Sequence, residues 1–147
     1  MTIGPFVPGF SGPFAIVVSP DGFTALITNF GSNDFSPFGT SVEILDLTTN
    51  TIATTVNGGI QPAAIAITTD GKFAYFTNYN TLYAGADFTG LTTGQGTVNV
   101  IDLSTRALVI PTILVGQSPS GIAITPDGKF ILVTNYTSNT VTVVPIH

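Results

Sequence analysis

The amino-acid sequence predicts an all-β fold in which one four-stranded antiparallel unit is repeated. One pattern, ending in Asn-Phe or Asn-Tyr, occurs three times, at residues 12–30, 61–79 and 118–136. Measured between Asp21, Asp70 and Asp127, the period is 49 residues (70 − 21) and then 57 (127 − 70). No stretch combines helical spacing of apolar residues with helix caps. Repeats of about 40 to 50 residues that hold four strands are typical of β-propeller blades, so we predict three blades.

Each full repeat divides into four short strands. In the first repeat we expect strands at residues 14–19, 23–29, 41–47 and 51–56, which are rich in Thr, Val, Ile and Phe. The first two strands of each repeat are joined by an Asp-Gly pair, which supplies the positive φ of a tight hairpin. We therefore interpret six residues as structural turn residues: Asp21, Gly22, Asp70, Gly71, Asp127 and Gly128.

The predicted strands are apolar on both faces, as in residues 64–67 and 131–133. Strands of a sheet with one wet face alternate more cleanly, so the continuous runs indicate sheets stacked face to face. The first strand of the repeats contains small residues. Such residues fit the central axis of a propeller, where the inner strands converge. A β-sandwich or a solenoid is the alternative, and the four-strand repeat favours the propeller.

The two ends of the chain suggest how a ring could close. We expect one domain over residues 1–147, divided into an outer strand and connection (1–11), blade 1 (12–60), blade 2 (61–116) and blade 3 (117–147). Blade 3 lacks an outer strand, and residues 1–7 lie where an outer strand would precede blade 1. Exchange of that strand between two chains would close a six-bladed homodimer and cap an exposed sheet edge. A filament built head to tail, or a longer propeller, are the alternatives.

Composition excludes several classes of partner. Charged residues make up 7% of the chain, against about 25% in an average soluble protein. The net charge is −5 and the basic residues are Lys72, Arg106 and Lys129, which argues against nucleic acid or an anionic membrane surface. No apolar run is long enough for a membrane span. The start of the chain lacks the pattern of a signal peptide. The Thr, Asn and Gly content favours an extracellular or cell-surface location, with the cytoplasm left open.

Residues 122–129 (IAITPDGK), 133–136 (VTNY) and 98–103 (VNVIDL) resemble the YVTN family of β-propeller repeats. The resemblance covers nearly the whole chain. It implies the propeller fold, and it implies function less directly. Members of that repeat family serve as surface-layer, adhesion and binding modules, whereas related lactonase-like propellers are enzymes. Fold alone does not decide between these functions.

The loops that join the second and third strands of each blade, here named the b–c loops, carry the candidate site. They span residues 31–40 and 80–96 in the first two blades but only 137–139 in the third. Long loops on a rigid scaffold are where binding residues concentrate. The candidates for binding a ligand or partner are aromatic and acidic: Phe35, Phe38, Tyr83, Asp87 and Phe88. The alternative interpretation is that these rings only pin the loops to the blades.

Few residues suit catalysis. The chain has no Cys and one His, the last residue His147, so a His-dependent nucleophile or a His-based metal site is not expected. We therefore expect no metal and no cofactor. The expected function is a non-catalytic binding or assembly module that self-associates and presents its b–c loops to a glycan or a protein. The alternatives are a lactonase-like, metal-assisted hydrolase using Asp34, Glu43 or Asp87, and a subunit of a surface layer or filament.

Overall fold

The computed structural model describes residues 4, 6–31, 38–83 and 91–146. Blade 1 is a four-stranded antiparallel sheet of β1 (Pro13–Val18), β2 (Thr24–Gly31), β3 (Phe38–Asp46) and β4 (Thr51–Asn57), in that order. Each strand follows the one before it in the chain, as short turns between neighbouring strands require. The four strands lie within three residues of the predicted ranges, and the all-β prediction is confirmed.

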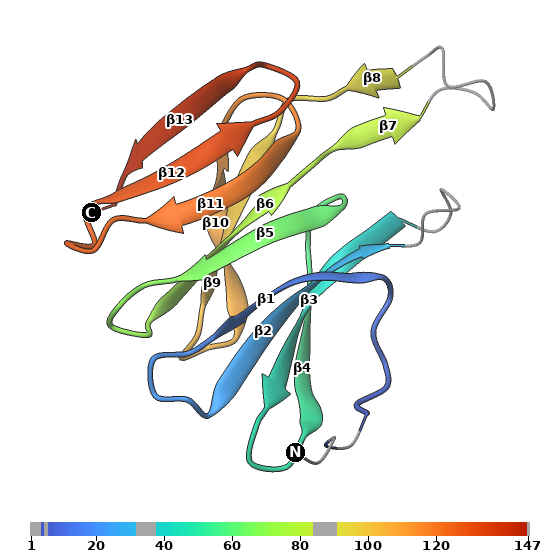
Figure 1. The fold of residues 1–147 in the computed structure, drawn as a ribbon, viewed down its shortest axis with the longest axis vertical. Coiled ribbons are helices and arrows are strands. Elements are labelled where there is room, and N and C mark those ends of the chain that lie inside the picture. Colours follow the sequence, from blue (N-terminus) through green and yellow to red (C-terminus); the bar gives the residue numbers. More distant parts are fainter. Residues whose placement is uncertain (1–3, 5, 32–37, 84–90, 147) are drawn as a thin grey trace.

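Blade 2 repeats this order with β5 (Pro62–Ile67), β6 (Phe73–Asn78), β9 (Thr97–Asp102) and β10 (Ala107–Leu114). Between its second and third strands lies a small hairpin of β7 (Thr81–Tyr83) and β8 (Leu91–Thr93) that the sequence did not predict. Blade 3 contains β11 (Pro119–Ile124), β12 (Phe130–Asn135) and β13 (Thr140–Pro145). Figure 1 shows the three sheets side by side, with the β7–β8 hairpin projecting beyond them.

The blades stack face to face through two apolar cores. The first core joins Leu26, Val42 and Ile44 of blade 1 to Ile65 and Phe76 of blade 2. The second core joins blade 2 to blade 3, with these buried residues: Tyr75, Val98, Val100, Val115, Ile131 and Val133. Because each blade buries one face on each neighbour, its strands are apolar on both faces, as the sequence pattern indicated.

The first strands of the three blades form the inner row of the stack. Strand β5 of blade 2 contacts both β1 and β11. A buried hydroxyl ties two of these blades together, since Thr28 Oγ1 donates a hydrogen bond of 2.7 Å to the carbonyl oxygen of Ala63. The inner row therefore brings equivalent positions of three repeats to one place, although they are some fifty residues apart in the chain.

The turn between the first two strands has the same structure in every blade. In blade 1, Asp21 Oδ1 accepts hydrogen bonds from Ser19 Oγ (2.5 Å) and from the backbone N–H of Phe23 (3.0 Å), and Gly22 has φ 78°. Asp70 and Asp127 accept the equivalent bonds from Thr68 and Thr125. Gly71 and Gly128 both have φ 70°. These hydrogen bonds close the hairpin, and none of the three carboxylates lies in a pocket with another acid.

The described residues contain no helix with the length and apolarity needed to cross a membrane.

Candidate functional site

The most distinctive cavity lies where the three inner strands begin. It is a hollow of about 380 Å³, lined by six side chains: Phe14, Phe30, Ala63, Tyr79, Ser120 and Tyr136. We name it the aromatic hollow. Four of its six residues are aromatic, and every blade contributes to it. In a propeller the blades surround a central channel, so a hollow at the ends of the inner strands lies at an end of that channel.

Two repeat positions account for the whole lining. Phe14, Ala63 and Ser120 each follow the proline that opens an inner strand, namely Pro13, Pro62 and Pro119. Phe30, Tyr79 and Tyr136 each follow the buried asparagine near the end of a second strand. The fold therefore presents two short rows of equivalent side chains to the same space.

The backbone fixes the aromatic row. The N–H groups of Phe30, Tyr79 and Tyr136 each donate a hydrogen bond of 3.0 Å to the connection that enters their own blade. The acceptors are the carbonyl oxygens of Gly12, Gln61 and Ser118, which have φ 59°, 54° and 52°. This repeated positive φ turns the chain sharply into each inner strand. It places the three rings at one height on the stack.

Three of the four rings are in contact, and the rings at both ends of the row expose surface. The ring centroids of Phe14 and Phe30 are 5.1 Å apart, and those of Phe30 and Tyr79 are 5.8 Å apart with planes at 62°. Phe14 and Tyr136, at the two ends of the row, are 66% and 73% exposed. Such faces stack on flat apolar groups or on the C–H face of a sugar-like ring, and Tyr hydroxyls add polar contacts.

The basic side chains lie at the opposite end of the blades. Lys72 and Lys129 stand in the Asp-Gly turns, where they form exposed ion pairs of 3.6 and 3.9 Å with Asp70 and Asp127. Arg106 stands in the turn between β9 and β10 and lines a separate depression with Lys72. These are the three basic residues of the whole sequence. The end that carries the aromatic hollow thus has no cation.

The turn acids have a structural explanation. The side-chain hydrogen bond from Ser19, followed by the backbone bond from Phe23, holds the pKa of Asp21 below its ordinary value of 3.8. Hydrogen bonds from the Thr48 and Ser104 side chains likewise lower the pKa of Asp46 and Asp102. A carboxyl group with a lowered pKa is a poor general base at neutral pH, because it binds a proton less readily.

Glu43, one of the acids considered for a hydrolase, is buried within blade 1 and only 4% exposed. Its Oε1 accepts hydrogen bonds from Asn29 Nδ2 (3.0 Å) and Ser41 Oγ (3.2 Å), and its Oε2 accepts one from Thr55 Oγ1 (2.6 Å). At the equivalent place in blade 2, Asn99 Oδ1 accepts from Asn78. The carboxylate of Glu43 is therefore engaged inside the sheet and does not line the aromatic hollow.

The loop candidates are only partly described. Asp34, Phe35, Asp87 and Phe88 lie outside the described residues. Phe38 opens β3 opposite Gly31, and Tyr83 ends β7 opposite Leu91, but their side chains are not described. The binding role of these residues therefore stays a prediction. Among the described residues, no group of three or more His, Cys, Asp or Glu side chains could hold a metal ion.

Sequence reasoning missed the aromatic hollow, although one signal was visible. The aromatic residue after the asparagine recurs in all three repeats, and it was interpreted as part of the repeat signature alone. That its three copies line one hollow follows only from the packing of the inner strands.

The fold and the hollow together define a β-propeller with a cavity at the end of its inner strands. Residues 7–147 match the model of the family described as Lactonase, 7-bladed beta-propeller, and the chain belongs to this family. A comparison with curated protein sequences finds no match. The YVTN resemblance is thus confirmed only as far as the propeller fold.

Solved structures agree with the fold. Hydrazine synthase of Kuenenia stuttgartiensis is 32% identical, with a TM-score of 0.73 over 99% of this chain and 36% of that one. Two proteins named as proposed 6-phosphogluconolactonases are similar over about the same fraction of their length. The one from Bacteroides fragilis is 22% identical, with a TM-score of 0.68 over 93% of this chain and 35% of that one. The one from Bacteroides uniformis is 20% identical, with a TM-score of 0.68 over 95% and 38%.

These comparisons correct the functional expectation. The sequence favoured a non-catalytic binding or assembly module, and membership of a lactonase family contradicts both that function and the expectation that the chain is not an enzyme. The error came from treating the scarcity of His and Cys as an argument against catalysis. The chain spans little more than a third of the length of the structures it resembles, so the reacting groups need not all lie within these three blades.

Proposed function

We propose that these blades form part of a lactonase-like enzyme, and that the aromatic hollow holds the ring of an uncharged lactone while water opens it. The observation that carries the proposal is the hollow itself, with three blades contributing equivalent aromatic residues to one concave surface. Family membership supports the reaction class. In the reaction, water adds to the ester carbonyl carbon, the bond from that carbon to the ring oxygen breaks, and a hydroxycarboxylic acid is released.

The lining residues would bind and orient the substrate. The faces of Phe30 and Tyr79 are placed to contact the C–H face of a five- or six-membered ring. Holding the ring in one orientation increases the reaction rate, because binding then meets the entropic cost of positioning the carbonyl carbon for attack by water. The hydroxyl groups of Ser120 and the two tyrosines are the polar groups of the lining and would contact the ring's oxygen atoms.

A group that activates water must come from elsewhere, because the six residues that line the hollow include no carboxylate and no imidazole. The b–c loops follow Phe30 and Tyr79 directly in the chain, and they contain Asp34 and Asp87. Within this chain we assign the general base to one of these two acids, each of which could take the proton from the attacking water. Glu43 is not assigned this role, because its carboxylate is engaged inside blade 1.

The charge distribution favours an uncharged lactone over a phosphorylated one. Proteins bind phosphate through Arg and Lys side chains or clustered backbone N–H groups. All three basic residues of this chain stand at the far end of the blades. Among the described residues, no Lys or Arg side chain lies at the hollow to pair with a phosphate group, in contrast to the substrate that the names of the Bacteroides proteins imply.

The test is lactone hydrolysis by the purified chain, followed by acid release in a pH-stat and corrected for spontaneous opening. We expect hydrolysis of glucono-δ-lactone and of a neutral γ-lactone, and a lower kcat/KM for the 6-phosphorylated lactone. Tyr79→Ala should raise KM about threefold to tenfold, the value of an aromatic contact. Phe23→Ala is the matched control, because this ring is 61% exposed but stands at the other end of the blade.

Two results would contradict the proposal. One is that no lactone is hydrolysed faster than the spontaneous rate and that none binds the chain in a calorimetric titration. The other is an equal KM in Tyr79→Ala and Phe23→Ala. The single variants Asp34→Asn and Asp87→Asn identify the general base. Replacement of the acid that acts as the base should lower kcat without raising KM, and replacement of the other acid should not lower kcat.

A further inference from the structure

Every inner strand has an irregular start, where two of its residues lie opposite one threonine of the second strand. The sets are Phe14 and Ala15 opposite Thr28, Ala63 and Ala64 opposite Thr77, and Ser120 and Gly121 opposite Thr134. Two residues opposite one form a β-bulge, which redirects a side chain and is common beside active sites. The first residue of each pair lines the aromatic hollow. We name these three residues the bulge residues: Phe14, Ala63 and Ser120.

Blade 3 uses its bulge differently from the other two blades. In blades 1 and 2 the threonine Oγ1 accepts a hydrogen bond from the second residue of the pair, at 3.0 Å from the Ala15 nitrogen and 2.9 Å from the Ala64 nitrogen. In blade 3 the Thr134 Oγ1 lies 3.3 Å from the Ser120 Oγ. Gly121 leaves room for this contact, because a Cβ atom there would stand 2.7 Å from Thr134 Oγ1. Ser120 is thus the bulge residue whose side chain carries a hydrogen-bonding group.

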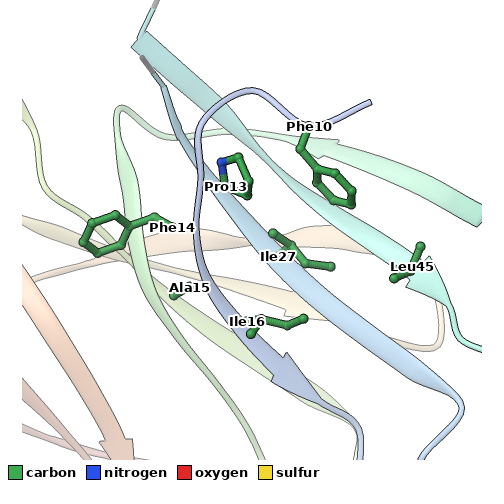
Figure 2. A pocket seen from close by; sticks show the side chains of 7 residues that line it. All are labelled: Phe10, Pro13, Phe14, Ala15, Ile16, Ile27 and Leu45. Atoms are coloured by element: carbon green, nitrogen blue, oxygen red, sulfur yellow. The ribbon is translucent and has the colours of Figure 1, made fainter. Parts of the chain in front are cut away.

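The polarity of the hollow changes from blade to blade. Blade 3 contributes two hydroxyl groups, on Ser120 and Tyr136, whereas blade 1 contributes two phenyl rings, on Phe14 and Phe30. Figure 2 shows the Phe14 side chain pointing away from Leu45, which belongs to an apolar cluster of blade 1. A lactone has the same two sides, since its ring carbons are apolar and its ester group is polar.

We propose that the Ser120 hydroxyl donates a hydrogen bond to the carbonyl oxygen of the bound lactone, whose ring carbons then lie towards Phe14 and Phe30. This inference rests on the proposed function and names a catalytic residue for it. When water adds to the carbonyl carbon, an electron pair of the C=O bond moves onto the oxygen. The hydrogen bond from Ser120 stabilises the negative charge that develops there.

The remaining steps need no further group. The intermediate forms the C=O bond again, and the bond from the carbonyl carbon to the ring oxygen breaks. The ring oxygen takes up the proton that the general base removed from the attacking water, so that a hydroxycarboxylic acid is released. Ser120 keeps its own proton throughout.

Ser120 acts here as a donor and not as a nucleophile. A serine hydroxyl attacks an ester when a base removes its proton, whereas the hydrogen-bonding partner of Ser120 is the hydroxyl of Thr134. We assign Thr134 as a positioning residue, because a hydrogen bond from its hydroxyl to Ser120 Oγ leaves the Ser120 proton free to point into the hollow. The two linked hydroxyl groups also polarise each other, which strengthens the donor.

The orientation also defines a preferred class of substrate, the alkyl-substituted lactones. An alkyl group on a ring carbon would contact Phe14 or Phe30, and burying one such carbon is worth up to about fourfold in affinity. We therefore expect a higher kcat/KM for δ-hexalactone than for δ-valerolactone, which differs from it by one methyl group. Phe14→Ala should remove most of this preference. Equal values for the two lactones in the parent chain would overturn the orientation.

The role of Ser120 is tested by the hydrolysis of δ-valerolactone. Ser120→Ala should lower kcat about a hundredfold, the lower end of the contribution of one oxyanion donor, with little change in KM. Ser120→Thr keeps a hydroxyl group and should retain most of kcat, and Thr134→Val should lower kcat less than Ser120→Ala does. Thr77→Val is the matched control, because it removes the equivalent hydroxyl of blade 2, which does not line the hollow. This variant should leave kcat unchanged.

A binding experiment separates this inference from the proposed function. δ-Valerolactam has the same ring size and a carbonyl group but is not hydrolysed, and tetrahydropyran has the ring without the carbonyl group. In NMR titrations, Ser120→Ala should weaken the binding of δ-valerolactam about twofold to tenfold, the value of a neutral hydrogen bond. The binding of tetrahydropyran should not change.

The outcomes are distinct for the two proposals. Equal effects of Ser120→Ala on both ligands, or a Ser120→Ala variant that hydrolyses lactones with the kcat of the parent chain, would overturn the role of Ser120 and leave the proposed function in place. A parent chain that binds neither a lactone nor δ-valerolactam would overturn both.

Discussion

Glu43 shows how one substitution in a repeat can resemble a functional residue. The equivalent residues of the other blades are Asn99 and Thr142. Each accepts a hydrogen bond from the asparagine that recurs near the end of the second strand of every blade. A carboxylate at this place accepts from one more neighbour, Thr55, because it offers a second oxygen. Glu43 thus accepts the same structural hydrogen bond that Asn99 and Thr142 accept in the other two blades.

We predict that Glu43→Ala lowers the free energy of unfolding by about 1–3 kcal/mol, because the donors Asn29 Nδ2 and Thr55 Oγ1 lose their acceptor inside the sheet. Glu43→Gln should cost less, since its amide oxygen still accepts one of these bonds. Urea denaturation measures both changes, with Thr49→Ala in an exposed turn as the control. If Glu43→Gln kept full stability but abolished lactone hydrolysis, the carboxylate would belong to the reaction after all.

At the scale of the structural elements, the contribution of the Asp-Gly turns to folding stability depends on pH. The pKa of Asp21, Asp70 and Asp127 is held below the ordinary value of 3.8, in each case chiefly by a hydroxyl donor two residues earlier. A pKa that is lower in the folded chain means that the charged form favours folding. These turns therefore contribute stability above pH 3.8, and that contribution is lost as the pH falls below this value towards the folded pKa.

We predict that the melting temperature of the parent chain falls between pH 4 and pH 2. The melting temperature of the Asp127→Asn variant should fall less over the same range. The amide keeps an acceptor for Thr125 Oγ1 but has no carboxylate to protonate. Thermal unfolding followed by circular dichroism at pH 7, 4 and 2 measures both effects. Equal losses for the variant and the parent would show that these turns do not set the acid response.

The strands and turns could be predicted because their determinants are local. Apolar β-branched runs and Asp-Gly pairs mark β1, β2 and the turn between them without reference to the rest of the fold. The β7–β8 hairpin was missed because its strands, Thr81–Tyr83 and Leu91–Thr93, are short runs inside a Gly-rich loop. The aromatic hollow was missed for another reason: Phe30 and Tyr136 come to line one hollow only through the packing of the inner strands, which no local pattern encodes.

At the scale of the whole molecule, the three blades are not equivalent. Blade 2 is covered on both faces, whereas blade 3 leaves one apolar face open and blade 1 exposes the apolar side chains of β1. Single exposed apolar residues are ordinary, but contiguous apolar surfaces of this kind are typical of binding interfaces. Local opening is easiest where few apolar contacts hold a strand in place. Backbone amides should therefore be most protected from hydrogen exchange in blade 2, which is covered on both faces.

We predict that backbone amides of β6 and β9 exchange with deuterium most slowly. Strand β13, an edge strand of blade 3 with Val141 and Val143 exposed, should exchange fastest among the core strands. The physical reason is that β6 and β9 lie inside a sheet covered on both faces, whereas β13 has a neighbouring strand on one side only. Hydrogen exchange followed by mass spectrometry measures the rates of the three strands. Protection of β13 equal to that of β9 would contradict the prediction.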